Sequence, residues 1–156
     1  MSFMFSALEA EQFREILSLP NDQLATHNAI EIIAEENGTL PCRVSLRNAC
    51  KGEAVLLLNY EHLSVASPYR SRHAIYVRRA AETAAPAIDE IPDILRGWPL
   101  SIRAFDRHDM MISAEVIDDS ALKVRIDEIL VNNETDYIHI HFAGAGCYAA
   151  RVDRVT

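Results

Sequence analysis

Polar and apolar residues alternate along several short stretches of this chain. A period of two predicts β-strands, because successive side chains of a strand point to opposite faces. The clearest case is 137–142, where the two isoleucines and the phenylalanine fall on one face and the tyrosine and two histidines on the other. The run 147–152 follows after Ala-Gly-Ala-Gly, so the two stretches are predicted to pair as a hairpin.

The run 54–58 is apolar throughout and predicts a strand to Tyr60. Apolarity at every position is typical of burial on both faces, so this strand is expected at the centre of a sheet. The segment 24–37 fits a helix or a strand, and we favour a strand over 29–35. Further strands are predicted at 41–46 and 74–78, and residues 3–5 fit a short strand or a packed arm. Strands 100–105 and 110–116 are predicted to form a hairpin across the turn 106–109.

A helical period of 3.6 recurs in two places. The first helix is expected over about 7–17, with Ser6 and Glu9 as a capping box. The second begins near 118–120 and runs to about Leu130. The Ala- and Pro-rich segment 80–99 is expected to be a surface connection, with one helical turn starting at Pro92.

These elements predict an α+β fold. A length of 156 residues suits one globular domain, 1–156, with one substantial core. We expect a mostly antiparallel sheet of five to seven strands, with two main helices packed on one face.

Composition narrows the function classes. The net charge of −8 argues against a nucleic-acid partner, since such binding depends on neutralising phosphates. No apolar run approaches the roughly 18–20 residues that cross a bilayer, and the N-terminus lacks the basic region of a secretory signal, so no membrane partner is expected. Three cysteines without a CxxC pair fit a cytoplasmic location, and no cofactor motif is present.

Charge is distributed unevenly along the chain. Residues 42–79, which we call the basic segment, hold seven Lys or Arg and two acidic residues, whereas the remainder holds eight and twenty-one. The predicted strand 41–46 places Cys42 with the core side chains and presents Arg43, Ser45 and Arg47 on its polar face.

The motifs PCRVSLRNA, GEAVLLLNYEHL, SPYRSRHAIYVR and GCYAARV lie within residues 30–152. In these motifs the chain resembles a bacterial family called domain of unknown function 1203, or DUF1203. The resemblance implies membership and a single-domain protein, and it implies no activity or catalytic residue. It also favours the extended form of 29–35, which leads directly into PCRVSL.

The first candidate site is an anion-binding surface on the basic segment. Arginine has a planar donor fork that suits carboxylate or phosphate, and Ser, Tyr and His add single directed hydrogen bonds. The alternative is that these arginines form ordinary surface ion pairs, for example with Glu31, Glu35 or Glu36. The predicted ligand-binding residues are Arg43, Ser45, Arg47, Tyr69, Arg70, Arg72 and His73.

The second candidate is a metal site at His139 and His141, two imidazoles on one strand face. His62, His73 or Cys147 would supply further ligands. Without a CxxC or HExxH companion, the alternative is a half-exposed polar strand face that binds no metal.

The third candidate is Cys147 as a nucleophile, which requires a neighbouring base. The register of the hairpin decides whether Cys147 has a histidine base beside it. A four-residue loop, 143–146, pairs Phe142 with Cys147 and turns the sulfur toward the core, away from His141, whereas a loop one residue shorter or longer places it beside the histidines.

Taken together, the sequence favours a small binding module for an anionic small molecule or an acidic segment. One alternative is an enzyme that uses His139, His141 and Cys147, with or without a metal. Another is a homodimer or larger homo-oligomer, in which the basic segment of one copy meets residues 1–41 of the next, where one Arg stands against seven acids.

Overall fold

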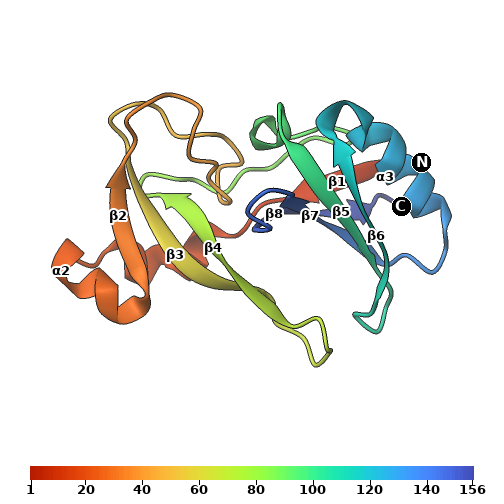
Figure 1. Ribbon diagram of the computed structural model, residues 1–156, viewed down its shortest axis with the longest axis horizontal. Coiled ribbons are helices and arrows are strands. Elements are labelled where there is room, and N and C mark those ends of the chain that lie inside the picture. The colour runs from red at the N-terminus through yellow and green to blue at the C-terminus, as the bar shows by residue number, and fades with distance from the viewer.

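The computed structural model describes residues 1–156 and contains two antiparallel sheets (Figure 1). The five-stranded sheet has the order β1-β8-β7-β5-β6, and the three-stranded sheet has the order β2-β3-β4. The larger sheet consists of β1 (Phe3–Ser6), β5 (Pro99–Phe105), β6 (Met111–Asp118), β7 (Tyr137–Phe142) and β8 (Tyr148–Arg154). The smaller sheet consists of β2 (Ala29–Ile33), β3 (Ala54–Leu63) and β4 (Ser71–Arg78).

The helices are short. They are α1 (Arg14–Leu17), α2 (Asn21–Leu24) and α3 (Leu122–Val131), with 3₁₀ turns η1 (Ala10–Phe13), η2 (Ala25–His27), η3 (Asp93–Leu95) and η4 (Asp119–Ala121). None of the helices has the length and apolarity needed to cross a membrane. The predicted α+β class with antiparallel pairing is confirmed, and the eight strands divide between two sheets.

The first predicted helix begins later than expected. Ser6 belongs to β1, where it pairs with Arg151, so it does not cap a helix. Helical structure starts instead at Ala10, after an extended Glu9 that makes no side-chain cap bond. The Ala10 N–H is satisfied by Thr83 Oγ1 at 2.8 Å, so a distant loop replaces the predicted capping box. The pairing of β1 with β8 therefore determines the structure at Ser6, and the local capping pattern does not.

Each sheet has its own apolar core. The five-stranded sheet packs against α3, whose buried Leu122, Ile126 and Leu130 meet Ile138 and Ile140 of β7. The three-stranded sheet packs against the N-terminal helical turns. Its core consists of Phe13, Leu24, Ala29, Cys42, Val44, Leu56, Leu58, Ile75 and Val77.

The segment 41–48 is a folded loop rather than the predicted strand. It makes only isolated bridges, Pro41 to Asn48 and Cys42 to Tyr76, and Leu46 has a φ of 52°. Cys42 is buried in the core as predicted, but Arg43 is fully buried too, which the alternation did not indicate. The loop folds back on itself, because the N–H of Leu46 donates to the carbonyl of Cys42 at 3.0 Å.

The two sheets lie beside each other in Figure 1, and side chains of β3 and β4 contact side chains of β7 and β8 between them. As a result every residue of β7 is buried, including the tyrosine and histidines of its polar face. The interpretation of this face as half-exposed is therefore wrong, because a second sheet covers it.

Candidate metal centre between the sheets

Four histidines meet in the layer between the sheets, and we call them the histidine cluster: His62, His73, His139 and His141. The alternation of β7 points His139 and His141 to the same face. His62 lies in an irregularity of β3 between Tyr60 and Leu63, where the register with β4 shifts. His73 comes from the neighbouring stretch of β4.

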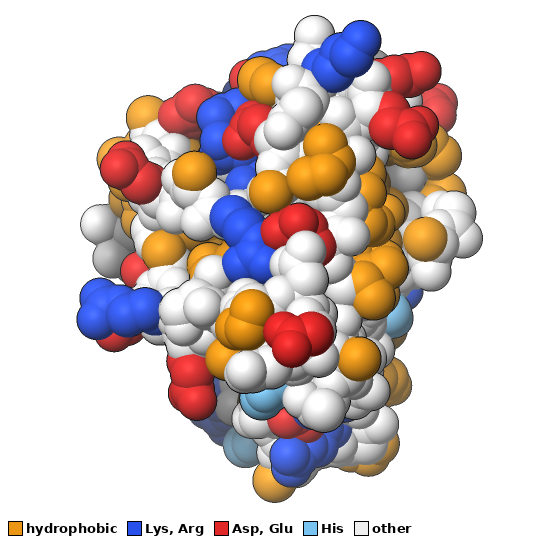
Figure 2. All heavy atoms as spheres, turned by 90° about the vertical axis from the view of Figure 1, so that its left-hand side faces the viewer, with side chains coloured by type: hydrophobic (Ala, Val, Ile, Leu, Met, Phe, Trp, Pro, Cys, Tyr) orange, Lys and Arg blue, Asp and Glu red, His pale blue; other side chains and the backbone are white.

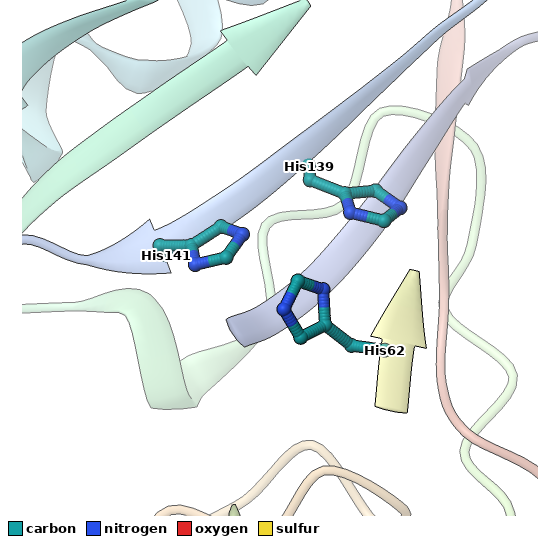
Figure 3. A group of neighbouring side chains, drawn as sticks. All are labelled: His62, His139 and His141. Atoms are coloured by element: carbon teal, nitrogen blue, oxygen red, sulfur yellow. The ribbon is translucent and has the colours of Figure 1, made fainter. Parts of the chain in front are cut away.

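Three members of the cluster, which we call the three-histidine site, face a common space: His62, His139 and His141 (Figure 3). One ring nitrogen from each lies within 4.8 Å of the other two. Tetrahedral zinc with Zn–N bonds of about 2.0–2.1 Å separates its ligand nitrogens by about 3.4 Å, so the rings need only move slightly inward to hold an ion.

Each of the three rings has at least one nitrogen without a hydrogen bond. His62 Nδ1 and His139 Nδ1 are buried and have no hydrogen-bond partner. His141 Nδ1 lies 2.8 Å from the carbonyl of Gly146, so this nitrogen is the protonated donor and Nε2 retains its lone pair. An imidazole whose other nitrogen donates to a backbone carbonyl is the usual form of a metal-bound histidine.

His62 has a similar support on its far side. Its Nε2 lies 2.7 Å from His73 Nδ1 and 3.1 Å from Ser71 Oγ. When Nε2 of His62 is the protonated donor, Nδ1 presents its lone pair to the common space. The Ser71 hydroxyl donates to the carbonyl of Tyr69 at 2.9 Å and so is placed to accept from His62 Nε2, which favours this tautomer and orients the ring.

Burial keeps the three rings neutral. It is the main cause that lowers the pKa of His62 to about 4, of His139 to about 3 and of His141 to about 2. The positive charge of Arg103 lowers all three further. Neutral imidazole is the form that binds metal ions, so no proton has to be displaced at neutral pH.

A cleft of about 340 Å³ borders the site. His62, His73 and His141 form part of its wall, and Arg103 of β5 forms another part. The rest of the lining consists of Leu63, Pro68, Tyr69, Arg70, Ser71, Phe105 and Met111, with no carboxylate among them. A ligand in this cleft would reach the edge of the histidine cluster.

The residues of the predicted anion surface do not form one surface. Arg43 is completely buried and donates to the carbonyls of Tyr148 at 2.7 Å and Pro41 at 2.5 Å, and to Cys147 Sγ at 3.1 Å. It thereby ties the loop 41–48 to the β7–β8 hairpin. Ser45 and Arg47 line a separate pocket, while Tyr69, Arg70 and His73 line the cleft beside the histidines.

Five of the six arginines of the basic segment pair with carboxylates, four with acids of the same segment and Arg79 with Glu31. Arg70 and Arg72 both bind Glu61, and Arg47 and Arg78 both approach Glu53. Figure 2 accordingly shows basic and acidic side chains interleaved over the face that carries the three-stranded sheet. Ion pairing thus accounts for most of the positive charge, through Glu61, Glu53 and the predicted Glu31, and not through Glu35 or Glu36.

Cys147 does not join the histidines. The N–H of Phe142 donates to the carbonyl of Cys147 at 2.9 Å, which is the four-residue loop of the prediction. The sulfur packs at the edge of the larger core and contacts Arg43. A bulge in β8 then pairs Tyr148 with His141, so a tyrosine takes the place beside the histidines, where its ring stacks on His62.

Two residues of this site were not singled out by the sequence in their present roles. The sequence offers His62 as one of three possible further ligands, and no pattern in it points to Arg103. Arg103 pairs with His139 across β5 and β7, so it shares the face of the histidines. Once β5 and β7 are taken as neighbours, the polar Ser101 and Arg103 of β5 would indicate this face.

The molecule is thus an α+β protein of two antiparallel sheets with a histidine cluster between them. A family model described as "Protein of unknown function (DUF1203)" matches residues 39–154, and the chain belongs to this family. The match includes all four histidines of the cluster. No curated protein and no solved structure matches the chain.

Proposed function

We propose that this protein binds a divalent transition-metal ion, with zinc as the best fit, at the three-histidine site. The observation that supports the proposal most directly is the pair of buried nitrogens, His62 Nδ1 and His139 Nδ1, which have no hydrogen-bond partner. A buried polar atom left without a partner costs about 1–3 kcal/mol. A metal ion would satisfy both atoms at once, whereas an aromatic stack of histidines would satisfy neither.

The chemistry of the donors selects the metal class. Imidazole nitrogen suits zinc, copper, nickel and iron, while calcium and magnesium require oxygen ligands that are lacking among the three donors. Three protein ligands also leave a fourth position free, as in catalytic rather than structural zinc sites. A bound zinc ion would act as a Lewis acid and lower the pKa of a water molecule at that position.

The position of the site also predicts a structural effect. His62 belongs to the three-stranded sheet, and His139 and His141 belong to the five-stranded sheet. An ion held by all three would link the sheets, and binding to the folded state alone adds about 2.7 kcal/mol of stability at a hundredfold excess over Kd. We therefore expect metal to raise the melting temperature.

The test is a titration of chelator-treated protein with Zn²⁺ and Co²⁺, followed by calorimetry and thermal unfolding. We expect one ion per chain, and a loss of affinity of about a hundredfold or more in His139→Gln and His141→Gln. His108→Gln is the matched control, because His108 is an exposed histidine in the β5–β6 turn. Absence of stoichiometric binding, or equal losses in the His108 variant, would overturn the proposal.

A cytoplasmic location is part of the proposal. Cys42, Cys50 and Cys147 are all free thiols, and Cys50 is exposed. Exposed free thiols persist in a reducing compartment, and they are seldom left unpaired in secreted proteins.

A further inference from the structure

Arg103 differs from Arg70, Arg72 and Arg151 in having no acidic partner, and from the equally unpaired Arg43 in having no carbonyl acceptors for its guanidinium. Arg70, Arg72 and Arg151 each contact a carboxylate, of Glu61 or Asp153. The one hydrogen bond of Arg103 runs from Nε to the neutral Ser101 Oγ at 3.1 Å. Its two terminal nitrogens, which hold four of the five N–H donors of a guanidinium, therefore face no protein acceptor.

The surroundings of Arg103 make this unpaired charge informative. The side chain is partly buried, and the loss of water around it lowers the pKa of its guanidinium. Its terminal nitrogens are not among the buried atoms that lack a partner, so they remain open to the cleft and to a ligand in it. The cleft that Arg103 lines offers hydroxyls, histidines and apolar side chains, but no carboxylate that would neutralise the guanidinium.

The guanidinium and the three-histidine site border the same cleft. Arg103 is in register with His139 across β5 and β7, and His62 and His141 line the cleft together with it. A ligand with two or more oxygens could therefore place one oxygen at the metal and another on the terminal nitrogens of Arg103. Such a fork-to-oxyanion contact is the characteristic use of arginine in anion recognition.

We infer that the cleft binds a small oxyanion, a carboxylate or a phosphate, between Arg103 and the metal. This inference rests on the proposed metal site for one end of the ligand and on Arg103 for the other. The hydroxyl of Ser71 and the ring of Tyr69 complete the polar wall, and Leu63, Phe105 and Met111 provide an apolar wall for the body of the ligand. The basic segment would then contribute to ligand binding through its cleft-lining residues, whereas the arginine that binds the oxyanion, Arg103, lies outside this segment.

The experiment compares phosphate, acetate and benzoate as ligands of the Co²⁺-loaded protein. Oxyanion binding at the free coordination position should change the visible absorption of the Co²⁺ ion. Arg103→Gln should bind Co²⁺ with the same stoichiometry, but its affinity for the oxyanion should fall by about ten- to a hundredfold. Tighter binding of benzoate than of acetate would identify a carboxylate with an apolar body, and preference for phosphate would identify a phosphate ester.

Arg107→Gln is the matched control, because Arg107 is exposed, lies four residues further along the same hairpin and forms no ion pair. It should leave oxyanion affinity unchanged.

A second arm uses metal-free protein, where phosphate or benzoate should still raise the melting temperature in wild type but not in Arg103→Gln. If metal binding fails while this Arg103-dependent shift persists, the metal proposal is wrong and the oxyanion site stands. If Co²⁺ binds but no oxyanion effect depends on Arg103 in either arm, the inference is wrong and the metal site stands.

Discussion

Strand β7 is buried on both faces, but the side chains that cover the two faces differ in polarity. One face packs Ile138 and Ile140 against α3 in a core made entirely of apolar side chains. The other places His139 and His141 against the three-stranded sheet, where aromatic rings meet polar atoms. Equal burial thus accompanies opposite chemistry within six residues.

The energetic roles of the two faces also differ. The apolar face gains stability from every methylene that it removes from water. The histidine face leaves buried nitrogens unsatisfied and holds ionisable groups in their neutral state, so it lowers the stability of the metal-free fold. Residues that lower the stability of the fold are typical of a binding site, as on the histidine face, whereas the apolar face stabilises the fold.

The largest effect that we predict is a loss of stability of metal-free protein in mild acid. Folded pKa values of about 4, 3 and 2 for His62, His139 and His141 lie below the unfolded value near 6.5. Below about pH 6.5 the unfolded chain therefore binds protons that the folded chain does not, and the free energy of unfolding falls as pH falls. The slope approaches about 1.4 kcal/mol per pH unit for each such histidine once the unfolded imidazoles are fully protonated.

Denaturant unfolding between pH 7 and 5, in the presence of a chelator, would measure this slope. Burial also lowers the pKa of His73, so His141→Gln removes one of four contributing groups and should make the slope shallower by about a quarter to a third. A free energy of unfolding that is flat between pH 6.5 and 5 would mean that the rings are solvated and protonated in the folded protein.

The apolar face of β7 should respond to truncation but not to pH or metal. Ile140→Ala removes buried methyl and methylene groups from the core against α3 and should cost about 3 kcal/mol. The same loss is expected at pH 7 and pH 5.5, with and without zinc. A cost that changed with zinc would show that the two faces are coupled, which would weaken the contrast between them.

The histidine face should tolerate an apolar replacement when metal is absent. His139→Leu replaces an imidazole with an unsatisfied nitrogen by a side chain of similar size, so metal-free stability at pH 7 should rise by about 1 kcal/mol. The zinc-dependent rise in melting temperature should disappear in the same variant. Chemical unfolding with and without zinc measures both quantities, and a large destabilisation without metal would identify His139 as a structural residue instead.

The smallest effect concerns the exposed arginines of the basic segment. Arg72 lies on the protein surface, more than half exposed, and approaches Glu61 at 3.7 Å. Surface pairs of this kind contribute little, so Arg72→Gln should change the free energy of unfolding by less than about 0.5 kcal/mol. Oxyanion affinity of the Co²⁺-loaded protein should also stay unchanged, and a clear loss would return Arg72 to the ligand-binding surface.

Much of the secondary structure could be predicted locally. The hairpins at 100–116 and 137–152 were predicted because period-two alternation and turn residues agree there. The strand at 29–33 and the helical turn after Pro92 were also predicted close to their observed positions. The segment 41–48 was not, because alternation of buried and polar residues describes a folded loop as well as a strand when an arginine is drawn inside.

The candidate site could be predicted only in part. The pairing of His139 with His141 on one strand face follows from spacing alone. Cys42 is buried as predicted, although its segment is a loop and not the strand from which that burial was argued. The third imidazole comes from β3, 77 residues before His139, and its side chain turns toward β7 from within a strand irregularity. Net charge along the chain was misleading, because it does not reveal that Glu53 and Glu61 neutralise most of the exposed arginines around them.

By itself, the sequence determined an α+β chain of antiparallel strands, a family, and one strand that presents two histidines together. These features depend on local periodicity and turn chemistry, which neighbouring residues specify. Only the tertiary structure decided that the strands form two sheets, that His62 completes a three-histidine site between them, and that Arg103 rather than the exposed arginines remains unpaired beside it. Those outcomes depend on contacts between residues far apart in the chain. The periodicity of a strand shows which side chains share a face, but not which other strand or sheet that face contacts.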